Sequence, residues 1–173
     1  MFDVRVSNIK ISLKTNLDIS RNQFPNEKRI NNFLVYRQDS FVYVIFPKGH
    51  VNVTGIKSYN DISRAVDVIK ETVVNFSPSF KITKLNIDNI SAHGRITNEI
   101  INLWTFIDKA RDKTIIIGIE FDPCTFPALK IYTTLGTALL FSNGKINLSG
   151  CKRLKHVQSL YGICKQFLSI GHI

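Results

Sequence analysis

Hydrogen-bonding, aromatic and cationic residues occur twice in this chain at one fixed spacing. Residues 46–57, FPKGHVNVTGIK, recur as FSNGKINLSGCK at 141–152, with every position 95 residues later. Amides and hydroxyls form hydrogen bonds, rings stack, and ammonium groups attract anions. The doubled residues therefore predict recognition of a partner rather than catalysis. They are Phe46 and Phe141, Asn52 and Asn147, Thr54 and Ser149, and Lys57 and Lys152.

Residues that could support catalysis or bind a metal have no recognisable arrangement. The acidic residues that lie near one another in sequence have no nucleophile or base at a productive spacing. They are Asp108, Asp112, Glu120 and Asp122. The four histidines are scattered, and the three cysteines have no CxxC spacing, so neither a zinc site nor a disulfide framework is indicated. We predict a non-enzymatic protein without metal or cofactor.

Composition points to an anionic partner. The chain has 173 residues, a formal net charge of +10 and a pI of about 9.7. Such a balance favours nucleic acid or an anionic membrane surface as the partner. The sequence has no apolar run of about 18 residues, so we expect neither secretion nor membrane spanning.

Each copy of the doubled block lies in a predicted β-hairpin. Residues 41–54 and 137–149 each contain two apolar strands joined by a turn with a Gly, and the second turn is Asn143-Gly144. Side chains alternate between the two faces of a strand. Val42, Val44 and Phe46 then share one face of the first strand. Asn52 and Thr54 share one face of the second strand.

A predicted amphipathic helix follows each hairpin, because apolar residues recur at helical spacing after Tyr59 and again after Arg153. Ser58 and Asn60-Asp61 offer capping chemistry at the first helix. A helix covers only one side of a sheet. If the apolar residues of the second strands face the helices, the amides and hydroxyls face outward. Those apolar residues are Val51, Val53, Ile146 and Leu148.

The two halves differ in their middles. The second half carries a predicted helix over Arg95–Lys109, whose apolar stripe is Ile96, Ile100, Leu103, Trp104 and Ile107. In the same region the first half has room only for a short helical turn near Leu17–Arg21. Alternating strands surround Asn8 in the first half and Asn89 in the second. The sequence predicts an α+β fold of two repeats, residues 1–77 and residues 78–173.

This order of elements resembles the TATA-box-binding protein family over nearly the whole chain. The resemblance rests on the repeated Phe-x-x-Gly-x-x-x-x-Thr/Ser-Gly-x-Lys block, on Asn-Ile at 8–9 and 89–90, and on Phe121-Asp-Pro-Cys-Thr-Phe-Pro-Ala128. It implies two pseudo-symmetric repeats that form one curved antiparallel sheet, a saddle, with helices on the convex face. The departures from the family pattern suggest a divergent member, viral or parasitic.

The resemblance implies that the open face of the sheet binds the minor groove of double-stranded DNA. Asparagines and hydroxyls would contact the groove floor, and Phe wedges would unstack base steps, a binding mode for which this family is the standard example. The lysines would lie near phosphates. The expected DNA contacts are Asn8, Ile30, Val42, Val44, Phe46, Asn52, Thr54, Lys57, Asn89, Phe126, Thr137, Leu139, Phe141, Asn147, Ser149 and Lys152.

The resemblance also implies partners and a place of action. The DNA would be an A·T-rich promoter, and the protein partners would be initiation factors of the IIB class, or divergent equivalents, and RNA polymerase. No membrane is implied. The place of action would be the nucleus or, for a viral member, the host-cell site of viral transcription. The family's acidic residues before the second-half wedge are reduced to Asp122, which weakens the case for the standard IIB-class contact.

Two further departures concern the DNA-binding face. The first-half partner wedge aligns with Ile30, although Phe24 fits there with an insertion. Asn52 and Asn147 stand where the family has apolar side chains, and their amides predict a relaxed preference for A·T tracts. The second half keeps the fuller pattern and is expected to dominate binding.

Two alternatives remain open at this point. Phe46 and Phe141 could be ordinary core residues of a sheet, and the asparagines could be strand-end or turn residues. The same fold could also serve as a protein-interaction adaptor in a transcription complex, without canonical TATA binding.

Overall fold

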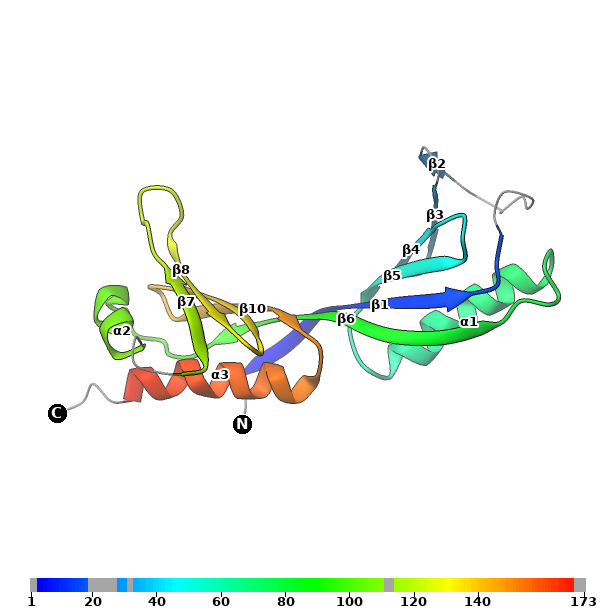
Figure 1. The fold of residues 1–173 in the computed structure, drawn as a ribbon. Coiled ribbons are helices and arrows are strands. Elements are labelled where there is room, and N and C mark those ends of the chain that lie inside the picture. Colours follow the sequence, from blue (N-terminus) through cyan, green and yellow to red (C-terminus); the bar gives the residue numbers. More distant parts are fainter. Residues whose placement is uncertain (1–2, 19–27, 31–32, 111–113, 170–173) are drawn as a thin grey trace. The chain divides into compact units, whose positions relative to one another are not determined.

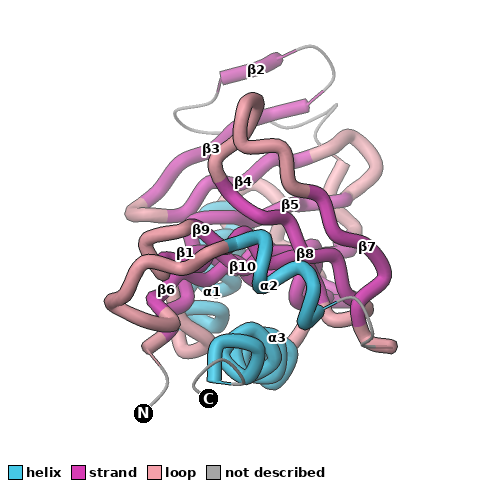
Figure 2. The backbone as a smooth tube through the Cα atoms, turned by 90° about the vertical axis from the view of Figure 1, so that its left-hand side faces the viewer, coloured by secondary structure: helices cyan, strands magenta, loops and turns pink. Residues whose placement is uncertain are grey.

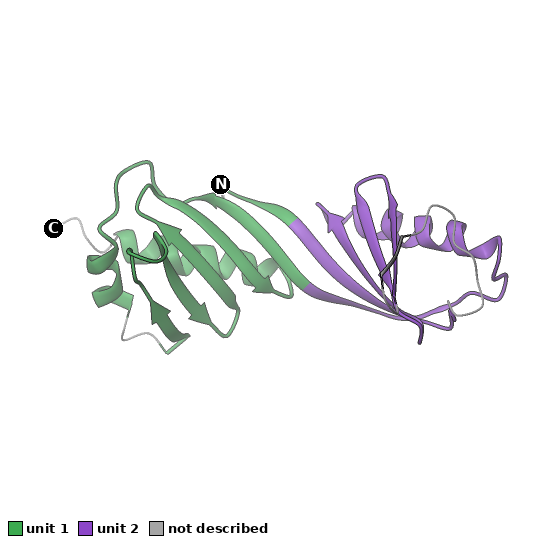
Figure 3. Ribbon diagram, turned by 90° about the horizontal axis from the view of Figure 1, so that it is seen from above, with its two compact units in different colours: residues 1–7, 89–173 green, residues 8–88 purple. Residues whose placement is uncertain are grey.

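The computed structural model describes residues 3–18, 28–30, 33–110 and 114–169 (Figure 1). They form two compact units, shown in Figure 3: an N-terminal unit of residues 8–88, and a C-terminal unit of residues 89–173 together with 1–7. The predicted repeats, 1–77 and 78–173, were defined by the duplicated sequence, whereas these units are defined by their compactness. Those boundaries therefore stay a prediction.

The described residues of the N-terminal unit form a sheet and one helix. Its strand order is β2-β3-β4-β5-β1, and β1 is followed by the first part of β6. The pairs β2–β3, β3–β4, β4–β5 and β5–β1 are antiparallel. The elements are β1 (Val4–Thr15), β2 (Lys28–Ile30), β3 (Phe33–Gln38), β4 (Phe41–Ile45), β5 (His50–Ile56), α1 (Asp61–Val74) and β6 (Ile82–Arg95).

The C-terminal unit has the same plan with an additional helix. Its strand order is β6-β10-β9-β8-β7, again with antiparallel pairs. Helix α3 packs against β9 and β10, and α2 packs against α3. Figure 2 shows α3 on one side of the strands of this unit. The elements are α2 (Leu103–Ala110), β7 (Ile116–Glu120), β8 (Ala128–Thr133), β9 (Gly136–Phe141), β10 (Lys145–Cys151) and α3 (Leu154–Ser169).

The hairpin register repeats at the spacing of the sequence block. Each cross-strand pair of β3 with β4 and of β4 with β5 has a counterpart 95 residues later in β8–β10 wherever both are paired. This confirms the predicted hairpins and the antiparallel α+β fold. Examples are Leu34↔Ile45 with Leu129↔Leu140, Val42↔Thr54 with Thr137↔Ser149, and Val44↔Asn52 with Leu139↔Asn147.

Burial alternates along the strands, and the core lies on the helix side of each unit. The side chains predicted to face the helices are buried, with exposed fractions of 1% or less: Val51, Val53, Ile146 and Leu148. Burial of such apolar surface, at about 25 cal/mol per Å², is the main term that holds each helix to its sheet. Helix α1 contributes Ala65, Ile69 and Val73 to this core, and α3 contributes Val157, Leu160, Cys164 and Phe167.

The predicted helix over Arg95–Lys109 was wrong in its first half. Strand β6 continues through Arg95, and the helix begins only at Leu103. The Asn102 side chain accepts hydrogen bonds from the backbone N–H groups of Trp104 and Thr105, at 3.0 and 3.4 Å, which fixes the start of the helix there. Ahead of it, the Ile101 N–H donates to the carbonyl of Ser142 and holds the segment in a non-helical path.

The apolar stripe predicted for that helix was also wrong in part. Ile96, Leu103 and Ile107 are buried, but Ile100 is 82% exposed and Trp104 59% exposed. Trp104 packs edge-on against Phe121, with ring centroids 4.9 Å apart. At the start of α1, Ser58 accepts a hydrogen bond from the Asp61 N–H, whereas the Asn60 side chain forms no capping bond. Most of the short turn predicted at 17–21 lies outside the described residues.

The hairpin glycines fix the ends of the central strands. In the C-terminal unit the Gly144 carbonyl accepts from the Ile96 N–H at 2.9 Å, and in the N-terminal unit the Gly49 carbonyl accepts from the Thr15 N–H at 2.8 Å. Gly144 has φ +80°, and a Cβ there would overlap the Thr97 carbonyl oxygen. Only glycine satisfies both the backbone angle and the close approach.

We expect Gly144→Ala to lower the free energy of unfolding by more than about 2 kcal/mol, because a left-handed backbone angle and a backbone overlap are both imposed on alanine. The matched control is Gly162→Ala in α3, where a Cβ meets nothing within 4 Å. That change should stabilise by about 0.5–1 kcal/mol through helix propensity. Urea unfolding followed by circular dichroism measures both values. Equal effects of the two changes would contradict the role of Gly144.

The cysteines divide into one exposed and two buried thiols. Cys124 is exposed, and Cys151 and Cys164 are buried. Burial raises the pKa of the Cys151 thiol to about 11 and that of Cys164 to about 12. An unfolded thiol ionises at lower pH, so these groups contribute stability below pH about 9 that is lost as the pH rises through the folded pKa values.

We therefore expect a thiol reagent such as 5,5′-dithiobis(2-nitrobenzoate) to label one thiol per native chain rapidly near neutral pH. In denaturant all three should react, because the thiolate is the reactive form and burial suppresses it. Cys124→Ser should remove the fast phase and leave the slow phase unchanged. Rapid labelling of one or both of the remaining thiols, Cys151 and Cys164, in the native Cys124→Ser protein would contradict their burial in the core.

Candidate nucleic-acid interface

In the part of the chain that the structure describes, no element covers the face of either sheet opposite its helix; we call this the open face. In the N-terminal unit the candidate residues on it are half-buried: Asn8, Val42, Val44, Phe46, Asn52 and Thr54. In the C-terminal unit Asn89, Thr137, Leu139 and Phe141 are half-buried, and Asn147 and Ser149 are exposed. Residues between them along the strands are buried against the helices. The structure thus brings these candidates onto one face of each unit.

The strand register places amides beside aliphatic groups. Asn52 pairs with Val44 on one side and with Ser12 on the other. Asn147 pairs with Leu139 and with His93. Each open face therefore has a row of hydrogen-bonding groups in the middle and aliphatic side chains next to it.

Asn8 and Asn89 are held in the same way in the two units. The Asn8 Oδ1 accepts from the Gly55 N–H at 2.8 Å and from the Thr54 hydroxyl at 3.1 Å. The Asn89 Oδ1 accepts from the Gly150 N–H at 2.6 Å. Because the oxygen of each amide faces the backbone, its NH₂ group is the end left to donate elsewhere. Both asparagines lie inside long strands, so the reading of them as turn residues was wrong.

The amide donors are partly free. The Asn89 Nδ2 donates to the Ser91 hydroxyl at 3.0 Å, which uses one of its two hydrogens. Within the described residues, the Asn8 Nδ2 donates no hydrogen bond. The glycines that hold the amide oxygens have positive φ, +90° at Gly55 and +76° at Gly150, and lie at irregular points in the pairing of β5 with β1 and of β10 with β6.

Each open face carries a pair of phenylalanine rings at one end. Phe126 and Phe141 have ring centroids 6.3 Å apart, and Phe33 and Phe46 have centroids 5.8 Å apart. Phe126 remains 36% exposed. The wedge candidates of the second half therefore meet, and neither Phe46 nor Phe141 is fully buried in a core.

Phe33 was missed by the sequence reasoning. The 95-residue offset places it opposite Phe46, where the second half has Ala128 opposite Phe141. The repeat does not reveal it, because the residue at the corresponding position of the second half, Ala128, has no ring. Ile30 lies at the end of β2 and its backbone pairs with Phe33, whereas Phe24 lies outside the described residues, so the choice between these two as a wedge stays a prediction.

Ionisable residues that the sequence reasoning did not select as contacts also lie on the open faces. Lys10 and Arg37 belong to the N-terminal unit, and His93, Lys130 and Glu120 to the C-terminal unit. Strand alternation from Asn8 and Asn89 would have found Lys10 and His93. The predicted Lys57 and Lys152 are exposed just after β5 and β10.

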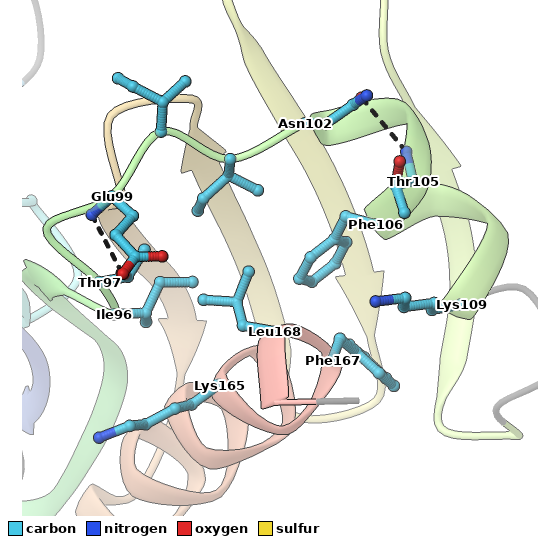
Figure 4. Close-up of a pocket in the computed structure, with 12 residues that line it drawn as sticks. Ile96, Thr97, Glu99, Asn102, Thr105, Phe106, Lys109, Lys165, Phe167 and Leu168 are labelled. Carbon is cyan, nitrogen blue, oxygen red and sulfur yellow. Dashed lines mark hydrogen bonds between the residues drawn. The ribbon is translucent and has the colours of Figure 1, made fainter. Parts of the chain in front are cut away.

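One cavity lies away from the open face. It has a volume of about 400 Å³ and is lined by the segment 96–102, by α2 and by the end of α3 (Figure 4). Its charged groups are Glu99, Lys109 and Lys165, and the remainder is aliphatic, aromatic, hydroxyl or amide. In the part of the chain that the structure describes, no three His, Cys, Asp or Glu side chains could hold a metal ion together.

Comparison with known proteins identifies the relatives of this chain. No protein-family model matches it. The TATA-box-binding protein of Pyrococcus abyssi is 32% identical over 147 residues, which cover 83% of this chain and 73% of the relative. That of Picrophilus torridus is 24% identical over all of this chain and 98% of the relative. No helix among the described residues is long and apolar enough to cross a membrane.

A solved structure has the same fold. The protein described as Methanococcus jannaschii TBP superposes with a TM-score of 0.77 over 97% of this chain and 99% of its own, at 21% identity. This confirms the predicted α+β fold. Taken with the Pyrococcus abyssi relative, it shows that the chain belongs to the TATA-box-binding protein family, a family of transcription factors and not of enzymes.

Proposed function

We propose that this protein binds the minor groove of A·T-rich promoter DNA and bends it, as a transcription initiation factor. One observation carries the proposal. On the open face of each unit, an asparagine anchored by a glycine N–H lies with a hydroxyl and a second amide, and a pair of phenylalanine rings lies at one end.

The polar groups suit the chemistry of the minor groove. Its floor presents the acceptors adenine N3 and thymine O2, and its walls are apolar sugar. Asn8 and Asn89 keep their Oδ1 atoms on the backbone and offer NH₂ donors to such acceptors. The aliphatic neighbours Val44 and Leu139 can contact the sugars. Exposure of such aliphatic and aromatic groups to solvent is unfavourable unless a partner covers this face.

The ring pairs suit insertion between base steps. Apolar side chains that enter from the minor groove unstack a step and kink the duplex, which increases the contact area. We assign this role to Phe126 with Phe141, and to Phe46 with Phe33. Lys57 and Lys152 would lie near phosphates, and the net charge of +10 supports attraction to the duplex.

The protein partners stay at the level of class. We propose an initiation factor of the IIB class, or a divergent equivalent, and RNA polymerase. Asp122 is the acidic residue left in the expected docking segment, and it is engaged locally: its Oδ1 accepts from the Cys124 N–H, and its carbonyl from the Phe126 N–H. This engagement shapes the loop that leads to Phe126 and favours a divergent equivalent.

The second candidate function is a protein-interaction adaptor without canonical TATA binding. One observation favours it: the carboxylate of Glu120 lies on the open face of the C-terminal unit, where it would repel a polyanion. DNA bending separates the two functions, because an adaptor that uses the open face for protein has no reason to kink a duplex.

We expect the protein to raise energy transfer between dyes at the two ends of an A·T-rich duplex. Phe141→Ala should reduce the bend, and Asn89→Ala should weaken binding by about 1–2 kcal/mol, the value of a lost hydrogen bond. Matched controls are Tyr59→Ala and Asn60→Ala, which truncate an exposed ring and an exposed amide next to α1. Absence of bending at every salt concentration would favour the adaptor.

Replacement of single A·T pairs by G·C should cost this protein less than the roughly 1–3 kcal/mol per mismatch that is typical of specific sites. The Oδ1 atoms of Asn52 and Asn147 can accept the guanine N2 donor that an apolar surface rejects. The double change Asn52→Val with Asn147→Val should restore strict A·T preference. Competition binding with G·C placed at each central step measures this, and complete loss of wild-type affinity at every G·C position would rule out the role of the two amides.

A further inference from the structure

Glu120 occupies a small cluster of donors on the open face of the C-terminal unit. It pairs across the strands with Lys130, whose Nζ lies 3.3 Å from Glu120 Oε2. The Tyr132 hydroxyl donates to the same oxygen at 3.0 Å. One carboxylate oxygen therefore receives an ammonium and a phenol donor from neighbouring positions of β8.

These two donors are of the kind that bind DNA phosphate. Lysine and tyrosine side chains both hydrogen-bond to phosphate oxygens in protein–DNA interfaces. Lys130 also lies 5.6 Å from the centre of the Phe126 ring, so an anion held there would be next to the proposed wedge. Glu120 is the one acidic residue among the described strand residues of this unit. Its carboxylate takes the place that a phosphate would have.

We propose that Lys130 and Tyr132 form a phosphate-binding site which Glu120 occupies in the free protein, so that Glu120 limits the affinity for DNA. This inference rests on the proposed function. The side chains of Glu120 and Lys130 are 61% and 37% exposed. An ion pair this exposed contributes little stability, so removal of the Glu120 carboxylate frees Lys130 for a phosphate with little effect on the fold. The hydrogen bond to Glu120 raises the pKa of Tyr132 above its ordinary value.

The N-terminal unit supplies an internal comparison. The 95-residue offset places Arg37 where Tyr132 stands and Val35 where Lys130 stands. Arg37 is exposed, and no described carboxylate lies within salt-bridge distance of it. At this position the N-terminal unit therefore has a cation that no described carboxylate neutralises, whereas Lys130 of the C-terminal unit is paired with Glu120. This difference makes the effect of Glu120 specific to the C-terminal unit.

The test is a double-mutant cycle in DNA binding. Fluorescence anisotropy with an A·T-rich duplex is measured for the wild type, Glu120→Gln, Lys130→Gln and the double variant, between about 0.05 and 0.2 M salt. Glu120→Gln should bind about 3- to 10-fold tighter, with a salt slope steeper by about 0.9, the value for one additional phosphate contact. Lys130→Gln should change affinity by about twofold or less in the wild type and cancel most of the gain in Glu120→Gln.

The control variant is Asp67→Asn on α1. It removes the same charge from an exposed ion pair, Asp67 with Lys70 at 3.6 Å, on the helix side of the other unit. Its affinity should stay within about twofold of the wild type. A gain with Asp67→Asn equal to that with Glu120→Gln would reduce the effect to net charge and overturn the proposal.

Three other results would also overturn it. They are unchanged or weaker binding by Glu120→Gln, a gain that survives fully in the double variant, and no binding by either the wild type or Glu120→Gln. The first two leave the proposed function intact if the wild type still bends DNA through Phe141. The third removes both. Binding by Glu120→Gln where the wild type does not bind would support the proposal.

Discussion

The structure depends on one constraint: strand side chains alternate between two faces, and the described residues of each unit cover only one of these faces with a helix. The apolar side chains that fill the core must then lie at every second position of a strand. Val51 and Val53 do so on β5, and Ile146 and Leu148 on β10. The intervening positions are left uncovered. What stands there can be selected for a partner with little effect on the fold, and there the chain carries amides, hydroxyls and half-buried rings.

The 95-residue offset shows how strictly the hairpins obey this constraint. A slip of one residue would exchange the two faces, so the register must be pinned. Two glycine contacts in each unit do this. The carbonyl of the hairpin glycine holds the end of the central strand, and the N–H of a second glycine holds the asparagine amide. The glycines of the repeated block thus set both the register and the orientation of Asn8 and Asn89.

Sequence reasoning succeeded where the periodicity was long or doubled. The hairpins, α1, α3 and the open-face positions of the repeated block followed from alternation and from the offset. It failed at α2, where Asn102 and the backbone bond of Ile101 to Ser142 fix a start that the apolar spacing does not reveal. It also missed Phe33 and the place of Glu120 on the open face, because neither residue belongs to the repeated block and the role of each depends on a cross-strand neighbour.

The two open faces are similar in their amides and rings but differ in charge. This difference affects how each face could bind an anionic partner. An amide that replaces an aliphatic side chain must find a partner when water is removed, or the buried polar group costs about 1–3 kcal/mol. Under the proposed function, Asn52 and Asn147 therefore require a partner that offers hydrogen-bonding groups to both units. A carboxylate on the same surface would add repulsion by a polyanion unless a neighbour neutralised it. Lys130 supplies that neutralisation, and the Tyr132 hydroxyl adds a hydrogen bond. Under the proposal, Glu120 is therefore compatible with an anionic partner and moderates its affinity.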